Sequence, residues 1–171
     1  VRSLVTGKDG IVYVGGVGDF GYLKPTIDGN IVYQSLATRL DSADRNFADV
    51  WVNFSTKDGI YFYTKKQLFL WNGQSLKGWK PIKERTFMGY AVKDDLYVLE
   101  FGIGLMKLTE QGLTLIPDGD KLVNERTYVM LPIANNELLV GTHTQGAFTY
   151  SNGKFQKPTR FKELNEFLLQ N

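Results

Sequence analysis

The 171-residue sequence contains no cysteine, a single histidine and only five prolines. Without cysteine the chain has no disulfide framework, thiolate nucleophile or cysteine-ligated metal centre. No apolar run approaches the roughly 18 to 20 residues that a membrane-spanning helix needs, so we expect no membrane segment. Neither sign of charge dominates, because 20 basic and 18 acidic side chains give a formal net charge of +2. No Lys/Arg block is long enough to follow a phosphate backbone, which argues against nucleic acid as a partner.

Aromatic residues and glycine are plentiful. Phe, Tyr and Trp make up 13% of the chain, and there are 18 glycines. Aromatic residues favour strands, and glycine favours the tight turns that join them. The composition therefore indicates an all-β protein with many short strands.

Two kinds of turn signal alternate along the chain, and each occurs four times. The first kind precedes an apolar and aromatic segment, and it stands at Lys8-Asp9-Gly10, Lys57-Asp58-Gly59, Lys93-Asp94-Asp95 and Asn135-Asn136-Glu137. The second kind follows 14 to 19 residues later, at Asp28-Gly29, Asn72-Gly73, Gln111-Gly112 and Asn152-Gly153. The repeat length is about forty residues, which is typical of the four-stranded blades of β-propellers.

These repeats predict four antiparallel meanders, the blades of a partial β-propeller. The expected blades span residues 1–40, 46–84, 85–122 and 125–160. Apolar residues at helical spacing, from Phe161 to Leu168, predict a short amphipathic helix over 160–170, with Thr159 as its cap. The chain opens as if within a strand, so we expect a segment of a longer protein. The partners predicted for its open faces are the remaining blades or another copy of the chain.

Gly16, Gly18 and Gly21 spell the G-x-G-x-x-G pattern of dinucleotide-binding loops. That pattern holds a phosphate only where a helix begins at the third glycine. Here an extended segment follows and ends at Pro25, which disfavours helix in the residue before it. We therefore interpret the glycines as turn residues of the first blade, and we predict no cofactor.

The repeat pattern resembles the regulator-propeller repeats (two-component regulator propeller) of extracytoplasmic sensor regions in Bacteroidetes-type signalling proteins. The resemblance lies in "DGIVYVGGVGDFGYLKP" (9–25), "DVWVNFSTKDGIYFYTKKQLFLWNG" (49–73), "FGIGLMKL" (101–108) and "LLVGTHTQGAFTYSNGKF" (138–155). It implies a periplasmic or extracytoplasmic segment of a membrane-anchored protein. Such regions usually precede a triple-tyrosine β-sandwich and then a histidine kinase or a DNA-binding output module.

Catalytic chemistry finds little support in the sequence. His143 could serve as a general base or metal ligand, but we interpret it as a polar loop residue. The carboxylate pairs Asp94/Asp95 and Asp118/Asp120 lie in turns, where aspartate is favoured because it bonds local backbone. We therefore predict no catalytic residue, no metal site and no enzyme activity for this segment.

The topology predicts one binding face. In a meander, the loops between second and third strands lie at the same end as the connections between blades, and rigid scaffolds often bind ligands with such loops. The predicted ligand-binding residues at this end are Asp19, Phe20, Glu100, Phe101, His143 and Gln145. The leading hypothesis is a non-catalytic sensor that binds a small molecule such as a glycan or oligosaccharide. The alternatives are a protein-docking scaffold and, third, a propeller glycoside hydrolase.

Overall fold

The computed structural model describes residues 1–83 and 87–170, and within these ranges it contains sixteen strands. They form four four-stranded antiparallel sheets, in each of which consecutive strands are neighbours. The predicted all-β architecture of four meanders is confirmed. The contacts divide the chain into two compact units, residues 1–84 and 85–171. The expected boundary between the second and third blades lies outside the described residues.

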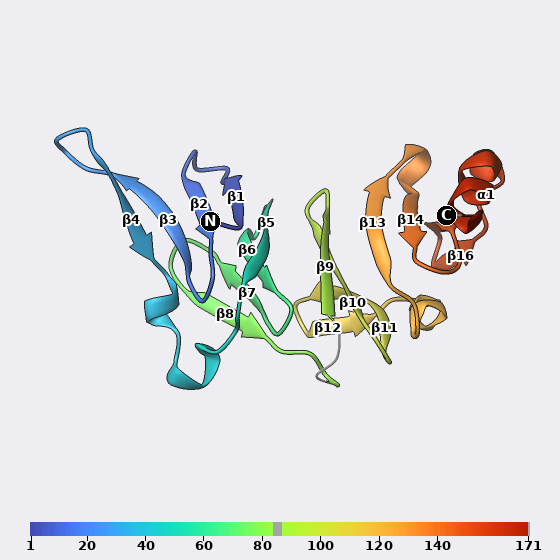
Figure 1. Ribbon diagram of the computed structural model, residues 1–171, viewed down its shortest axis with the longest axis horizontal. Helices are drawn as coiled ribbons and strands as arrows, with labels where there is room; N and C mark the ends of the chain where they lie inside the picture. Colours follow the sequence, from blue (N-terminus) through green and yellow to red (C-terminus); the bar gives the residue numbers. More distant parts are fainter. Residues whose placement is uncertain (84–86, 171) are drawn as a thin grey trace. The chain divides into compact units, whose positions relative to one another are not determined.

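The first unit contains two sheets (Figure 1). The first sheet consists of β1 (Ser3–Thr6), β2 (Val12–Gly15), β3 (Phe20–Pro25) and β4 (Ile31–Ser35). The second sheet consists of β5 (Val50–Thr56), β6 (Gly59–Thr64), β7 (Leu68–Trp71) and β8 (Leu76–Trp79). The connection between the sheets, residues 36–49, carries two 3₁₀ turns, η1 (Ala37–Arg39) and η2 (Ser42–Asp44).

The second unit also contains two sheets, followed by the C-terminal helix. The third sheet consists of β9 (Phe87–Val92), β10 (Asp95–Glu100), β11 (Gly104–Thr109) and β12 (Gly112–Leu115). The fourth sheet consists of β13 (Thr127–Pro132), β14 (Leu138–Thr142), β15 (Ala147–Ser151) and β16 (Lys154–Gln156). Short 3₁₀ turns are η3 (Gly119–Leu122) in the connection, η4 (Ala134–Asn136) in the β13–β14 hairpin and η5 (Thr159–Phe161) before the helix.

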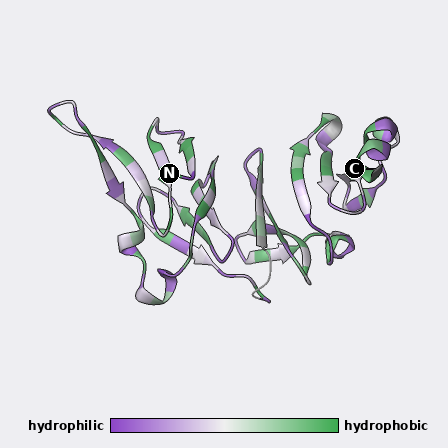
Figure 2. Cartoon of the chain, viewed as in Figure 1, coloured by the Kyte–Doolittle hydropathy of each residue, from purple (hydrophilic) through white to green (hydrophobic). Residues whose placement is uncertain are grey.

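The predicted turns are found where the sequence places them. The first kind of signal joins the first and second strands of each sheet, and the second kind joins the third and fourth strands. In Figure 2 the tip of the β3–β4 hairpin is hydrophilic, as its Asp28-Gly29 turn requires. Three non-glycine residues of these turns, Lys93, Asn136 and Asn152, have positive φ, an uncommon conformation that Asn and Asp tolerate best.

The first two glycines of the G-x-G-x-x-G segment lie in the β2–β3 loop, and Gly21 is already part of strand β3. Gly18 has a φ of 65°, which a side chain would disfavour. A Cβ on Gly21 would lie 2.1 Å from the Gln34 carbonyl oxygen of the adjacent strand. These glycines therefore serve a turn and a close strand contact, and no helix is present here to hold a phosphate.

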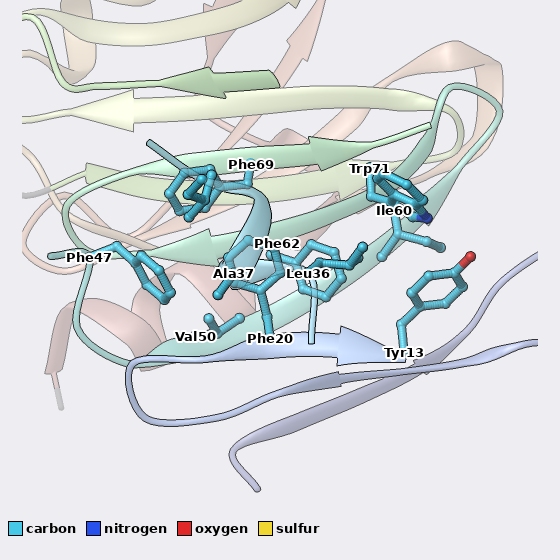
Figure 3. Close-up of a cluster of buried hydrophobic side chains, with 11 residues drawn as sticks. Tyr13, Phe20, Leu36, Ala37, Phe47, Val50, Ile60, Phe62, Phe69 and Trp71 are labelled. Carbon is cyan, nitrogen blue, oxygen red and sulfur yellow. The ribbon is translucent and has the colours of Figure 1, made fainter. Parts of the chain in front are cut away.

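Aromatic packing between the two sheets forms the core of the first unit (Figure 3). The ring of Phe20 on β3 lies 4.4 Å from that of Phe62 on β6 and 5.1 Å from that of Phe69 on β7. Phe47, from the connection, packs against Phe20 at 5.3 Å. The consecutive residues of β6 alternate across the sheet, which places Ile60 and Phe62 on the face toward the first sheet.

The second unit has an equivalent core between the third and fourth sheets. It is less aromatic, and Leu99 and Leu105 of the third sheet contribute to it together with Val140 and Phe148 of the fourth. Leu122, from the connection, is fully buried in the same cluster. In both units the connection thus packs into the core instead of crossing open solvent.

The C-terminal helix α1 spans Lys162–Gln170. Thr159 was expected to cap it, but Thr159 lies inside η5 and makes no cap, because that 3₁₀ turn precedes the α-helix. The helix contacts the fourth sheet through Asn165, whose Oδ1 accepts a hydrogen bond from the backbone N–H of Ala147 at 2.8 Å. Phe167 remains 60% exposed.

The Phe62 core contact generates a stability prediction. Phe62→Ala should lower the free energy of unfolding by about 3 to 5 kcal/mol, because it removes a fully buried ring and leaves a cavity. All three tryptophans lie in the first unit, so their fluorescence during urea unfolding reports on this core. Val17→Ala, at a 68% exposed position of the same unit, is the control and should change stability by less than about 0.5 kcal/mol. Equal effects of the two substitutions would contradict the assigned core.

Candidate functional site

The predicted binding end is built as expected within each unit. In the first unit, the β2–β3 loop bonds to the connection: Gly18 N–H donates to the Ala48 carbonyl at 3.0 Å, and Val50 N–H donates to that of Gly16 at 2.8 Å. In the second unit, Gly102 N–H donates to the Val123 carbonyl and His143 N–H donates to that of Arg126. We call this end of each unit, where second-to-third-strand loops meet the connection, the loop end.

A pocket of about 280 Å³ opens at the loop end of the first unit. Asp19 lines it, and so do Ser35, Thr38, Arg45 and Phe47. Asp19 is held in place because its Oδ1 accepts hydrogen bonds from its neighbour's backbone N–H at 2.8 Å and from the Ser35 hydroxyl at 2.7 Å. Of the six predicted ligand-binding residues, Asp19 is the one that this pocket includes.

The carboxylate of Asp19 also affects Tyr33 on β4. Partial burial raises the pKa of the Tyr33 phenol, and the negative charge of Asp19 and a hydrogen bond to it raise that pKa further. The phenol therefore keeps its proton and donates toward the carboxylate. Asp19 thus has its orientation fixed by backbone and side-chain donors before any ligand arrives.

Arg45 supplies the opposite charge to the same pocket. Its Nε donates to the Leu40 carbonyl at 2.9 Å, and its Nη2 donates to the Thr38 carbonyl at 3.1 Å. These bonds hold the guanidinium to the backbone of the connection, and among residues 1–83 and 87–170 no carboxylate pairs with it. The pocket consequently offers a fixed acceptor, Asp19, and a fixed donor, Arg45.

Phe20 does not belong to the binding surface that the sequence suggested. Its side chain is 0% exposed and lies among the aromatic rings of the core (Figure 3). The reason is the alternation of β3, which directs Phe20 toward the second sheet immediately after the loop ends. Its role is to anchor the loop that carries Asp19.

Glu100 is likewise buried, with 0% exposure at the end of β10. It pairs across the ladder with Phe87 and Gly104, so its position is interior to the sheet. The expectation of a surface carboxylate here is therefore corrected. Phe101 begins the β10–β11 loop and is partly exposed, so its predicted binding role stays a prediction.

His143 and Gln145 are both exposed in the β14–β15 loop. The Nδ1 atom of His143 lies 3.1 Å from the hydroxyl of Tyr128, and the two rings meet edge to face at 5.6 Å. Tyr128 is 62% exposed, so the pair is open to solvent. The backbone carbonyl of Gln145 accepts a hydrogen bond from the Lys157 ammonium. The predicted roles of His143 and Gln145 stay predictions.

Glu125 is a residue at this end that the sequence analysis did not single out. It is buried, and its carboxylate accepts hydrogen bonds from Arg126 N–H at 2.8 Å, from the Thr144 hydroxyl at 2.7 Å and from Thr144 N–H at 3.3 Å. Burial alone would raise its pKa, but these hydrogen bonds lower it below the usual 4.5. Glu125 lies in the connection between η3 and β13, where the sequence has no repeat pattern to mark it.

Within the described residues no group of three or more His, Asp or Glu side chains could hold a metal ion. No helix in that part of the chain is long and apolar enough to cross a membrane. Of the two aspartate pairs that the sequence offers, Asp118 is engaged within the protein: it accepts from Phe155 N–H at 2.7 Å and pairs with Lys121 at 2.8 Å.

Comparisons with known proteins concern the fold. No family model matches the chain, and neither does a curated protein. Among solved structures it is similar to a catalytically inactive histidine-to-alanine variant of virginiamycin B lyase from Staphylococcus aureus with quinupristin, at a TM-score of 0.62 and 15% identity. The selenomethionine-substituted lyase from the same organism matches with a TM-score of 0.60 and 15% identity.

The four sheets are β-propeller blades. Each match covers 92% of this chain but 56% of the lyase chain, so the chain spans about half the length of these structures. At 15% identity the likeness shows the fold alone.

The lowered pKa of Glu125 predicts a pH-dependent contribution to stability. Because the folded pKa lies below the usual 4.5, the ionised carboxylate stabilises the fold above that pH, and the contribution is lost as pH falls through the folded pKa. Glu125→Gln should therefore lower the melting temperature near pH 7, and the difference from the parent chain should shrink toward about pH 3.

Calorimetric melting curves over this pH range provide the measurement. Glu163→Gln, at an exposed position in the first turn of α1, is the matched control and should leave the curve unchanged. A difference between the parent and Glu125→Gln chains that stays constant across the range would contradict the assigned hydrogen bonds.

Proposed function

We propose that the chain is a non-catalytic, ligand-binding segment of a β-propeller sensor, and that its ligand enters the loop-end pocket of the first unit. The observation that carries this proposal is the fixed pair of Asp19 and Arg45 facing one pocket of about 280 Å³. Both side chains are held by hydrogen bonds within the protein. A ligand would therefore bind without ordering them, which lowers the entropic cost of association.

The chemistry of the pocket favours a polyhydroxylated ligand such as a glycan or oligosaccharide. Asp19 is an acceptor and Arg45 is a donor, and a sugar hydroxyl both donates and accepts. The buried side chains of Phe47 and Ala37 form part of the apolar lining of the pocket. The size of the pocket is near the lower limit of small-molecule sites, so we propose that it holds one end of a longer saccharide.

The resemblance to regulator-propeller repeats supports a signalling role. On this proposal the parent protein is membrane-anchored, the blades are extracytoplasmic, and ligand binding shifts a conformational equilibrium that reaches a phosphorelay output module. The loop that carries Asp19 is bonded to the connection between the sheets, so a ligand that moves the loop also moves that connection.

A docking scaffold is the second candidate, and β4 favours it. Ile31, Val32 and Tyr33 are consecutive exposed apolar residues on this edge strand. An exposed apolar edge is a surface on which another chain can add a strand or pack its own apolar face. The partner could be a further blade or another copy of this chain.

Enzymatic candidates have weaker support. The similar solved structures are of a lyase, and the inactive variant of that lyase has a histidine replaced by alanine. The one histidine of this chain, His143, is exposed and lies beside Tyr128. For a glycoside hydrolase, two carboxylates must be free to act on one bond. Asp118 and Asp95 are instead paired with Lys121 and Lys107, respectively.

Titration with an oligosaccharide panel, followed by tryptophan fluorescence and melting temperature, tests the pocket. A compound that binds should raise the melting temperature in a saturable manner. Asp19→Asn keeps the acceptor for the Phe20 and Ser35 bonds but removes the charge, so it should weaken binding by about tenfold. Asp28→Asn, in an exposed turn of the same sheet, is the control.

If Asp19→Asn binds as tightly as the parent chain, the pocket is not the site. If no compound in the panel produces a saturable shift, sensing of a saccharide is wrong, and self-association measured by light scattering then tests the docking scaffold. Turnover of virginiamycin B or of a saccharide, lost in His143→Ala or Glu125→Gln, would overturn the non-catalytic proposal.

A further inference from the structure

The opposite end of the second unit holds a larger cleft, of about 320 Å³, between the third and fourth sheets. Three hairpin turns surround it: β9–β10, β13–β14 and β15–β16. We call this the turn end, since it gathers the tight hairpin turns instead of the longer loops. Lys93, Asn136 and Asn152 stand at these turns with φ of 57°, 58° and 48°, and all three line the cleft.

Tyr97 lines the cleft, and its hydroxyl is the first of two donors that a ligand could use. The residue is 9% exposed, and among the described residues its hydroxyl has no hydrogen-bond partner. Its ring does have a neighbour, because the Lys107 ammonium lies 5.9 Å from the ring centroid. The hydroxyl itself is accessible from the cleft, so a ligand there can accept a hydrogen bond from it.

Lys93 provides a positive charge at the same cleft. Its ammonium lies 3.1 Å from Oδ1 of Asn136, a neutral partner, and within the described residues it has no carboxylate. The carboxylates at the cleft are already paired, Asp95 with Lys107 at 2.8 Å and Glu137 with Arg160. The cleft therefore offers one uncompensated positive charge and one phenolic donor.

The first unit contains the equivalent cleft, but there the tyrosine hydroxyl already has a hydrogen-bond acceptor within the protein. It lies among the matching turns, β1–β2, β5–β6 and β7–β8, and measures about 190 Å³. There the hydroxyl of Tyr13 donates to Oδ2 of Asp9 at 2.8 Å. In the second unit the repeat places Asp94 at the position of Asp9, but Asp94 does not line the cleft. Asp95 does line the second cleft, but it pairs with Lys107 at 2.8 Å, and among the described residues no carboxylate accepts a hydrogen bond from Tyr97 as Asp9 does from Tyr13.

We propose that the cleft at the turn end of the second unit binds a small hydroxylated carboxylate of the sugar-acid class. The ligand carboxylate takes the place that Asp9 holds in the first unit, where it accepts from the Tyr97 hydroxyl and neutralises Lys93. The Asn152 amide and the Ser151 hydroxyl at the mouth suit the sugar hydroxyls. This site is independent of the loop-end pocket proposed above, which lies in the other unit.

Calorimetric titration of the intact chain with D-glucuronate, and with D-glucose as the uncharged analogue, tests this proposal. Glucuronate should bind saturably, and glucose should bind at least about tenfold more weakly because it lacks the charge that Lys93 and Tyr97 recognise. Tyr97→Phe removes only a hydroxyl without a protein partner. It should therefore leave the melting temperature unchanged and weaken glucuronate binding by about tenfold.

Two further variants separate the sites. Lys93→Asn keeps a residue that tolerates positive φ while removing the charge, and it should abolish the preference for glucuronate over glucose. Tyr13→Phe is the matched control, because it removes the bonded hydroxyl of the equivalent cleft and should leave glucuronate affinity unchanged. Absence of saturable glucuronate binding, equal affinity for glucose, or unchanged affinity in Tyr97→Phe would each overturn the proposal. Asp19→Asn should not affect this titration.

Discussion

The ring centroids of Phe20 on the first sheet and Phe62 on the second lie 4.4 Å apart, and this contact positions the surrounding loops. Each sheet alone has an apolar face that must be covered, and the next sheet in the same unit covers it. The connection packs into the same core, through Phe47 in the first unit and Leu122 in the second. The loop end is rigid because its two components, loop and connection, are attached to one buried cluster.

The same scaffold creates two chemically different ends. At the loop end, charged side chains such as Asp19, Arg45 and Glu125 are satisfied by backbone groups and hydroxyls, which fixes their positions. At the turn end, the tight hairpins bring side chains together between sheets, and the two units differ in whether an aspartate accepts from the tyrosine of the cleft. The Tyr13 hydroxyl donates to Asp9, whereas the Tyr97 hydroxyl is accessible from its cleft.

The sequence predicted the elements well because local chemistry determines them. Asp-Gly and Asn-Gly turns at a regular spacing and the alternation of strands such as β6 specify four meanders without long-range information. The site was harder to predict. Asp19 could be placed at the loop end from topology, but the burial of Phe20 and Glu100 depends on which face of a strand meets the neighbouring sheet. Glu125 lies in a connection without a repeat pattern, so only its folded contacts identify it.

The bond between Asn165 of α1 and the backbone of Ala147 gives the helix a mechanical link to the sheet. Ala147 is the first residue of β15, directly after the loop that holds His143, and a Cβ on Gly146 would lie 2.4 Å from the Asn165 side chain. The helix therefore holds the first residue of β15 in place. Leu169 lies beside the same glycine, so a shift of the helix would displace the loop that carries His143.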